Sequence, residues 1–431
     1  MDMSQAKIRH MDTTLACLGL AMAASCLGCQ SKEKDPDTVP ALTQNMRTHC
    51  VGRFLVDLPQ DFRRIHVAAG GAGDATFYYG HDADFRTVNV TVIAQSITPE
   101  QFNTAVTGRA DELASGVNYE TNASMLLGRE AWTPTQVHLS SHASVDIADA
   151  QVHELHVLVG DTHVAINTTA FESAQIPDAE RRLRNILARV SKVGDPERAG
   201  PGVCLGSVVV DAGSDYEELQ LGYRSADRAR PDLRFQVSLN TFRQPDDEPS
   251  LIARGESNLA GLGVKPKALK KGKRQLAGLE GEEWLGRFEE DGRRQHGFYA
   301  ETGIRSPSPQ HPKLMLELFT GGEDHNGHAA ESSLDDEQAI ALWDRIVASL
   351  RARPGGIEFT GPAVRALLWA AFADADEPGF FRLSGLVRMH LPTWPQRYRP
   401  PNRREETLQL WSSIIASQPS QPPRRAMNRS I

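Results

Sequence analysis

Clusters of histidine, carboxylate and glycine residues are the parts of this chain that could do chemistry. The segment His153-Glu154-Leu155-His156 places two imidazoles close together, as metal sites often do. Its spacing differs from that of helical zinc motifs, and its alternating pattern is typical of a strand. Residues three apart on a strand face opposite sides, so one metal ion could not reach both. We interpret these histidines as solvated strand residues.

Two further clusters also lack the spacing of a known site. Residues 322–328 read Gly-Glu-Asp-His-Asn-Gly-His and offer oxygen and imidazole ligands, but not in the order of a calcium loop. We interpret them as the polar end of a hairpin. Residues 70–73 read Gly-Gly-Ala-Gly, which could approach a phosphate, but no helix start follows. We expect a flexible loop there.

The chain also lacks a Gly-x-Ser-x-Gly nucleophile elbow and a Gly-x-x-x-x-Gly-Lys-Ser/Thr phosphate loop. The sequence therefore predicts no catalytic residues, no cofactor and no metal ligands. This pattern favours a binding protein over an enzyme.

A repeated phrase reveals how the chain is organised. Cys50-Val-Gly-Arg-Phe-Leu-Val-Asp57 returns as Cys204-Leu-Gly-Ser-Val-Val-Val-Asp211. Each copy opens a segment of roughly 150 residues, and similarity at that length indicates two related domains. We place these domains at residues 48–195 and 202–354.

The same elements are expected in the same order in both halves. In the first half we predict strands at 52–58 and 87–94, a helix capped by Thr98, a hairpin from 153–159 and 163–169, and a closing helix with an apolar stripe over 183–190. In the second half we predict strands at 207–210 and 233–239, a helix from Pro249, a strand at 314–318 and a closing helix at 335–351. We also match Gly281–Trp284 with Gly128–Trp132. Each domain is therefore expected to be α+β, an antiparallel sheet with two helices and its own core, similar by analogy to the PsbP/Mog1-like fold.

The beginning of the chain is typical of an exported protein. Lys7 and Arg9 precede an uncharged, largely apolar stretch that is too short for a comfortable membrane span. We assign residues 1–29 to a signal peptide. Cys26 and Cys29 both follow small residues, as in a bacterial lipobox, and either could receive the lipid. The alternative is an ordinary cleaved signal with incidental cysteines. Residues 30–47 would form a linker.

Export would place the remaining cysteines of the repeated phrase in an oxidising compartment. Cys50 and Cys204 occupy equivalent positions, and a pseudo-twofold axis could bring them together. One interpretation is a disulfide that joins the two halves. The other is two buried, reduced cysteines, each inside its own half.

The net charge argues against a nucleic-acid partner, and two segments have an unusual charge composition. The net charge of −8 argues against nucleic acid. Residues 265–274 hold five Lys and one Arg, which predicts a solvated basic edge or a contact for an acidic partner. Residues 355–431 contain ten Arg, no Lys and nine prolines, so we expect a poorly ordered tail.

One family resemblance suggests a function. The opening Thr48-His-Cys-Val-Gly-Arg-Phe-Leu-Val-Asp-Leu-Pro59 resembles the start of the cognate immunity proteins of type VI secretion lipase effectors of the fourth class. The phrase at Cys204 resembles the start of that family's C-terminal domain, and residues 335–351 are similar to its end. The resemblance covers about residues 48–354.

This resemblance implies a periplasmic protein that protects its cell from a phospholipase delivered by sister cells. Two domains would grip the toxin like a claw and block the entry of lipid, with no catalytic residues of their own. The expected partners are therefore a secreted phospholipase effector and, through a lipid anchor, a membrane. The alternative is a periplasmic lipoprotein that binds a small ligand or assists assembly through the cleft between its domains.

Overall fold

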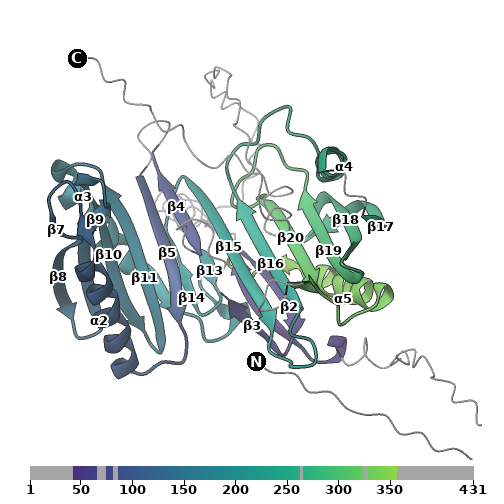
Figure 1. The fold of residues 1–431 in the computed structure, drawn as a ribbon, viewed down its shortest axis with the longest axis horizontal. Coiled ribbons are helices and arrows are strands. Elements are labelled where there is room, and N and C mark those ends of the chain that lie inside the picture. Colours follow the sequence, from purple (N-terminus) through teal and green to yellow (C-terminus); the bar gives the residue numbers. More distant parts are fainter. Residues whose placement is uncertain (1–41, 66–73, 81–85, 263–265, 324–328, 357–431) are drawn as a thin grey trace, which may run out of the picture. The chain divides into compact units, whose positions relative to one another are not determined.

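The computed structural model describes residues 42–65, 74–80, 86–262, 266–323 and 329–356 (Figure 1). All of them fall within one compact unit, residues 39–431. The predicted signal peptide with Cys26 and Cys29, the loop at 70–73 and nearly all of the tail lie outside the described residues. Within the described residues, no helix combines the length and the apolar character needed to cross a membrane.

Among the described residues, the first half contains strands β1 to β12 and helices α2 and α3. The strands are β1 (Met46–Gly52), β2 (Phe54–Pro59), β3 (Phe62–Ile65), β4 (Ala75–Tyr79), β5 (Arg86–Ala94), β6 (Val117–Asn118), β7 (Ala123–Ser124), β8 (Leu126–Thr133), β9 (Gln136–Ser144), β10 (Ile147–Val159), β11 (Thr162–Ala170) and β12 (Val190–Lys192). The helices are α2 (Pro99–Ser115) and α3 (Ile176–Leu187).

The second half repeats this order of elements. Its strands are β13 (Val203–Leu205), β14 (Val208–Val210), β15 (Tyr216–Ser225), β16 (Arg234–Asn240), β17 (Lys267–Leu276), β18 (Leu279–Glu290), β19 (Arg293–Thr302), β20 (Lys313–Thr320), β21 (Gly322–Glu323), β22 (Ala329–Ala330) and β23 (Arg351–Ala352). Its helices are α4 (Leu251–Leu262) and α5 (Asp336–Ser349). The α+β class with antiparallel sheets is confirmed.

Local sequence signals located several elements accurately. Helix α2 begins after Thr98, with Pro99 in its first turn and a capping box completed by Gln101. The hairpin of β10 and β11 turns at Gly160, whose positive φ of 66° suits glycine. The closing helix of the first half is shorter than predicted, because it ends at Leu187 and Val190 begins strand β12. The match of Gly281–Trp284 with Gly128–Trp132 is also wrong, since the first lies on β18 and the second on the edge strand β8.

One large antiparallel sheet runs through both halves (Figure 1). Its order is β17-β18-β19-β20-β16-β15-β4-β5-β11-β10-β9-β8, with β3 also paired to β15. Apart from β3, each half supplies six strands in corresponding order, and the two sets join where β4 pairs with β15, from Tyr216 opposite Tyr78 to Leu219 opposite Ala75. The halves are therefore connected by continuous backbone hydrogen bonds.

The second sheet interlocks the halves more closely. Its order is β12-β14-β13-β1-β2-β23. The opening hairpin of the first half, β1–β2, is completed by β23 from the end of the second half. The opening hairpin of the second half, β13–β14, is completed by β12 from the end of the first. The two hairpins meet where β1 pairs with β13, at Gly52 opposite Cys204.

A single large hydrophobic cluster fills the space beneath the large sheet. It contains Val88 and Val90 of the first half together with Leu219 and Leu221 of the second. The expectation that each half folds around its own core is therefore wrong, because residues of both halves bury one another. Both sheets contain strands from both halves, so the sheets do not mark where one domain ends. The boundaries at 48–195 and 202–354 therefore stay a prediction.

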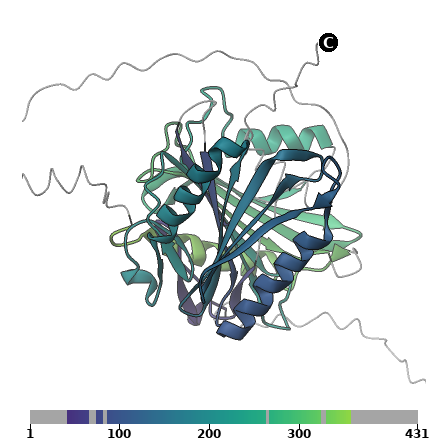
Figure 2. The same cartoon turned by 90° about the vertical axis from the view of Figure 1, so that its left-hand side faces the viewer.

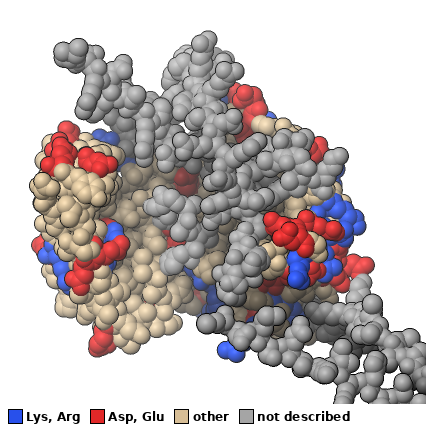
Figure 3. All heavy atoms as spheres, in the orientation of Figure 1, with Lys and Arg blue, Asp and Glu red and all other residues tan. Residues whose placement is uncertain are grey.

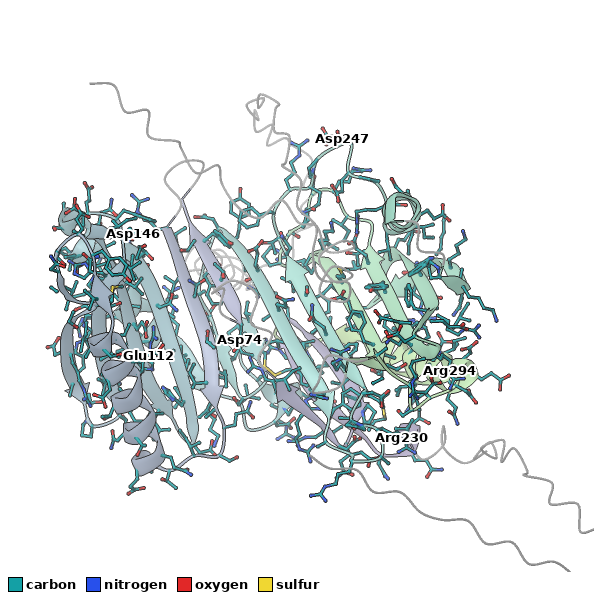
Figure 4. The ribbon with its side chains drawn as sticks, in the orientation of Figure 1. Asp74, Glu112, Asp146, Arg230, Asp247 and Arg294 are labelled. Carbon is teal, nitrogen blue, oxygen red and sulfur yellow. A yellow bond between two sulfur atoms is a disulfide. The ribbon has the colours of Figure 1, made fainter. Side chains whose placement is uncertain are left out.

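The cysteines of the repeated phrase lie at the centre of this arrangement. The sulfur atoms of Cys50 and Cys204 are bonded in the structure, visible as a yellow bond in Figure 4, and the Cα atoms are 5.7 Å apart. That separation is ordinary for a disulfide. A small apolar cluster that includes Leu55 and Val209 surrounds them. Whether the purified protein carries this bond stays a prediction.

A buried arginine fixes the link between the halves. The side chain of Arg353 donates hydrogen bonds to the carbonyls of Ala199, Gly200 and Gly202, at 2.5–2.6 Å. Only 2% of Arg353 is exposed, and burial lowers the pKa of its guanidinium to about 10. Arg353, near the end of the second half, thereby holds in place the segment that connects the first half to the second.

His153 and His156 are buried, contrary to the interpretation of solvated strand residues, and so are His138, His142 and His163. His153 contacts His138 at 3.1 Å and His156 contacts His163 at 3.0 Å, on opposite faces of β10 as the spacing predicts. Burial lowers the pKa of His153 and of His163 to about 4, and also lowers that of His138. These imidazoles are therefore neutral at physiological pH.

These histidines make the fold sensitive to acid. Below about 6.5, their ordinary pKa, the unfolded chain takes up protons that the folded chain does not bind until about pH 4. As the pH is lowered from 6.5 to 4, the free energy of unfolding should therefore fall. The fall is about 1.4 kcal/mol for each unit by which folding lowers the pKa of a histidine. Urea unfolding across this range measures it. His163→Gln should make the free energy of unfolding depend less on pH, whereas His311→Gln, at an exposed position, should not. The same pH dependence in all three proteins would contradict the role given to the buried histidines.

The cysteine pair has an equally direct test. Cys50→Ser, Cys204→Ser and the double variant should lose the same stability, because each removes the same bond. A bridge across 154 residues contributes roughly 4–5 kcal/mol in the chain-entropy model. Reductant should reproduce the loss in the unchanged protein. Intact mass with and without reduction decides the point first: thiols that alkylate freely in the unreduced, unfolded protein would rule out the bridge.

Candidate functional site

The outer face of the large sheet is the main candidate for a binding surface. Helix α2 covers one end of this face, where Phe102 and Val106 pack with Leu139 of β9. Helix α4 covers the other end, where Leu251 packs with Trp284 of β18. The strands between them, β11, β5, β4, β15, β16 and β20, separate the two helices (Figure 1). Helices α2 and α3 lie on opposite sides of the first half's sheet (Figure 2).

Strict alternation makes the two sides of these central strands different. On β5, Val88 and Val90 are fully buried in the core, while Asn89 between them is only partly buried. On β16, Val237 is buried and Ser238 beside it is partly exposed. Because neighbouring residues of a strand point to opposite faces, the apolar residues form the core and the polar ones form the outer face.

These polar side chains are joined across the strands, and we call them the polar strip. Three sets of hydrogen bonds make it up: Asn167–Asn89–Thr76 at 3.0 and 2.8 Å, Tyr78–Glu218–Asn240 at 2.5 and 3.0 Å, and Gln236–Glu317 at 2.7 Å. The strip crosses the junction of β4 with β15, so both halves contribute to it. Its hydrogen-bonding groups are thus fixed before any partner arrives.

Burial raises the pKa of both carboxyl groups of the strip. Burial raises the pKa of Glu218, and the hydrogen bond from Tyr78 only partly offsets this. Burial and the nearby Glu301 raise the pKa of Glu317 to about 8, so this carboxyl is mostly protonated at neutral pH. Glu317 itself is buried, with 1% of the residue exposed, so a partner would meet the partly exposed members of the strip, among them Asn89, Asn167 and Gln236.

An aromatic group borders the strip on strands β4 and β15. The ring of Phe242 lies 4.7 Å from that of Tyr78 and 4.6 Å from that of Tyr216, measured between centroids. Large, stiff aromatic side chains beside hydrogen-bonding groups are typical of protein interfaces.

The predicted histidine segment forms a different arrangement. The possible ligand atoms of His138, His153 and Glu180 lie within 4.8 Å of one another. The planes of the two imidazoles differ by 10° and their centroids are 5.3 Å apart, so the rings meet edge to edge. Their facing nitrogens thus point at each other, which suits a shared hydrogen bond better than a common metal ion.

The basic segment at 265–274 is mostly strand β17, at the edge of the large sheet. Lys270 pairs with Glu283 at 2.8 Å, and Arg274 pairs with Asp344 at 2.8 Å. Much of its charge is therefore neutralised within the molecule. An open groove of about 540 Å³ lies between this strand and the end of α5, lined in part by Lys273 and Leu350. Of the segment 322–328, only Gly322 and Glu323 are described, in strand β21.

The sequence did contain a signal for the polar strip, in the polar residues that alternate with Val88–Val92 and with Phe235–Leu239. It did not show which strands are neighbours. The strip depends on β4 lying beside β15, and these strands are more than 130 residues apart in the chain.

Comparisons with known proteins agree with this architecture. Residues 198–355 match the family model of the Tle cognate immunity protein 4 C-terminal domain. Among solved structures, the immunity protein TplEi of the type VI secretion system of Pseudomonas aeruginosa is 22% identical, with 72% of this chain and 97% of that chain covered and a TM-score of 0.51. A chain of the Tle4–Tli4 complex is 20% identical, with 72% and 99% covered and a TM-score of 0.51.

Two other comparisons add less. No curated protein matches the chain. The cyanobacterial PsbP of Synechocystis is 12% identical with a TM-score of 0.19, which is too low to carry an argument.

The two immunity-protein structures show the fold at this level of identity, and the family model covers the second half with its opening and closing segments. The resemblance drawn from the repeated cysteine phrase is thereby confirmed, and the second half of the chain is similar over residues 198–355 to the C-terminal domain of the Tle cognate immunity protein 4.

Proposed function

We propose that this chain is an immunity protein that binds a phospholipase effector of a type VI secretion system and so protects the cell that makes it. The observation that carries the proposal is the family match over residues 198–355. The likeness of the whole two-half fold to TplEi and to a chain of the Tle4–Tli4 complex supports it. The export signal in the sequence further supports a periplasmic location, with a lipid anchor at Cys26 or Cys29.

The polar strip is the surface that would receive the effector. Its hydrogen bonds join strands of both halves, and the interlocked sheets keep α2 and α4 at a set separation. A partner seated between these helices would therefore meet a surface that loses little conformational freedom on binding. A stable protein–protein complex typically buries roughly 1,600 Å² of total surface.

Occlusion is the inhibitory mechanism that such a surface can provide. The partly exposed amides and hydroxyls of the strip can hold a protein by hydrogen bonds, but they do not need to react with it. A rigid body seated over the entrance of a lipase would keep lipid from its active site. Inhibition would then follow from binding alone.

Protection of cells is the decisive measurement. Co-expression of the full chain with the lipase encoded beside its gene, exported to the periplasm, should restore growth. The paired change Gln220→Arg and Ser238→Arg places two long cations on partly exposed positions of the outer face. It should lower affinity at least tenfold and abolish protection, because the added side chains hold the partner away from the strip.

A matched control separates this effect from a general loss of stability. Asn185→Arg adds the same side chain at an exposed position of α3, on the other side of the sheet, and should protect as well as the unchanged chain. If the unchanged chain gives no protection, the proposed function is wrong. If the strip variant protects fully, the docking surface lies elsewhere.

A further inference from the structure

Half of the exposed large apolar side chains lie together at one place. Eight such residues occur among those described, and four of them belong to two neighbouring loops. These four, which we call the apolar tip, are Val117, Tyr119, Val145 and Ile147, with exposed fractions of 46, 70, 40 and 47%. They come from the β6–β7 hairpin and from the turn between β9 and β10. The tip is thus an exposed apolar group at the outer end of the first half.

Hydrogen bonds hold the two loops in place. Asn118 is completely buried, and its side-chain amide donates to the carbonyls of Ser144 and Ile147, both at 3.0 Å. The backbone N–H of Tyr119 donates to the carbonyl of Val145 at 2.7 Å. The side chains of the tip are therefore presented by a fixed backbone although they bury little surface themselves. Pre-organised aromatic and aliphatic side chains of this kind are typical of binding hot spots.

In the described part of the second half, the turn that corresponds to the one between β9 and β10 is not apolar. The hairpin of β18 and β19 corresponds to that of β9 and β10, and it turns through Glu290-Asp291-Gly292-Arg293. The turn residues Asp291 and Arg293 are exposed and charged. A charged turn is therefore sufficient to connect these strands, so the fold does not require the apolar residues of the first half.

The charge around the tip limits what it can contact. The two loops, residues 116–124 and 143–149, contain Glu120, Asp146 and Asp149, all exposed, and no Lys or Arg. Figure 4 labels Asp146 at this end of the sheet, where Figure 3 shows acidic side chains gathered on the surface. An acidic border repels the anionic surface of a bacterial membrane, and it also repels a second copy of the same tip.

We infer that the apolar tip is a second docking site for a protein partner, one that presents an apolar pocket bordered by Lys or Arg. This inference rests on the proposed function, in which that partner is the lipase effector. An enzyme that takes up lipid exposes apolar surface near its entrance, and the tip would bind such a surface. The polar strip and the apolar tip would then contact the same partner at two separate places, one neutral and polar and one apolar.

Binding by paired variants tests the inference. The probe is the lipase encoded beside the gene, inactivated at its nucleophile, and the readout is calorimetry with the full chain. Tyr119→Ser with Ile147→Ser should raise the Kd about tenfold or more, since both side chains lose apolar contact. Phe171→Ser, at a residue 63% exposed and outside the tip, is the matched control and should leave the Kd unchanged. Glu120→Lys with Asp146→Lys should slow association, most at low salt.

Each outcome has a distinct meaning. An unchanged thermal midpoint in the serine variant shows that the fold is intact. If the unchanged chain binds the lipase and the serine variant binds it equally well, the tip inference is wrong and the proposed function stands. If the unchanged chain does not bind, both are wrong. Tip-dependent binding to vesicles of phosphatidylethanolamine and phosphatidylglycerol, or a tip-dependent dimer, would also overturn the inference.

Discussion

The exchange of closing strands between the halves is the constraint on which the rest of this structure depends. Strand β23 completes the hairpin of the first half, and β12 completes that of the second. Neither small sheet segment is complete within its own half, so each half needs backbone hydrogen bonds from the other. Sheet strands without these partners would expose unpaired N–H and C=O groups. The two halves therefore form one folded body although their sequences repeat.

This exchange also sets the position of the groups nearest the pseudo-twofold axis. The pairing of β1 with β13 brings Cys50 and Cys204 to a Cα separation of 5.7 Å. Arg353 follows β23 directly and reaches the carbonyls of the connecting segment, including Gly202. Arg53, beside the same hairpin, forms a bidentate pair with Glu217 of β15 at 2.7 and 3.0 Å. The small sheet is in this way attached to the large one close to their common centre.

The two faces of the large sheet carry different kinds of side chain. Its inner face is apolar and forms the shared core, and its outer face carries the polar strip between two helices. Antiparallel strands permit this because successive side chains alternate. The repeat supplies similar strands twice, yet the outer ends of the halves differ, with an apolar tip on the first and a charged turn on the second. The halves thus share a similar frame, while the apolar tip and the charged turn distinguish their described outer ends.

The sequence by itself determined the elements and their repetition. Thr98 and Gln101 specify the start of α2 through local hydrogen bonds, and the alternation of Val88–Val92 specifies a strand with one buried face. Both signals act within a few residues, so a single sequence reveals them. The phrase at Cys204 likewise pointed to the family whose C-terminal-domain model matches residues 198–355, because its residues are read in order along the chain.

Only the tertiary structure decided which strands are neighbours. The pairing of β4 with β15 and of β2 with β23 joins residues that are far apart in the chain, and alternation does not specify a partner. The burial of His153 and His156 was missed for the same reason, since the helices and strands that cover β10 come from elsewhere in the chain. The polar strip and the apolar tip arise from contacts across strands and loops, where the free energy depends on the fold as a whole rather than on any one segment.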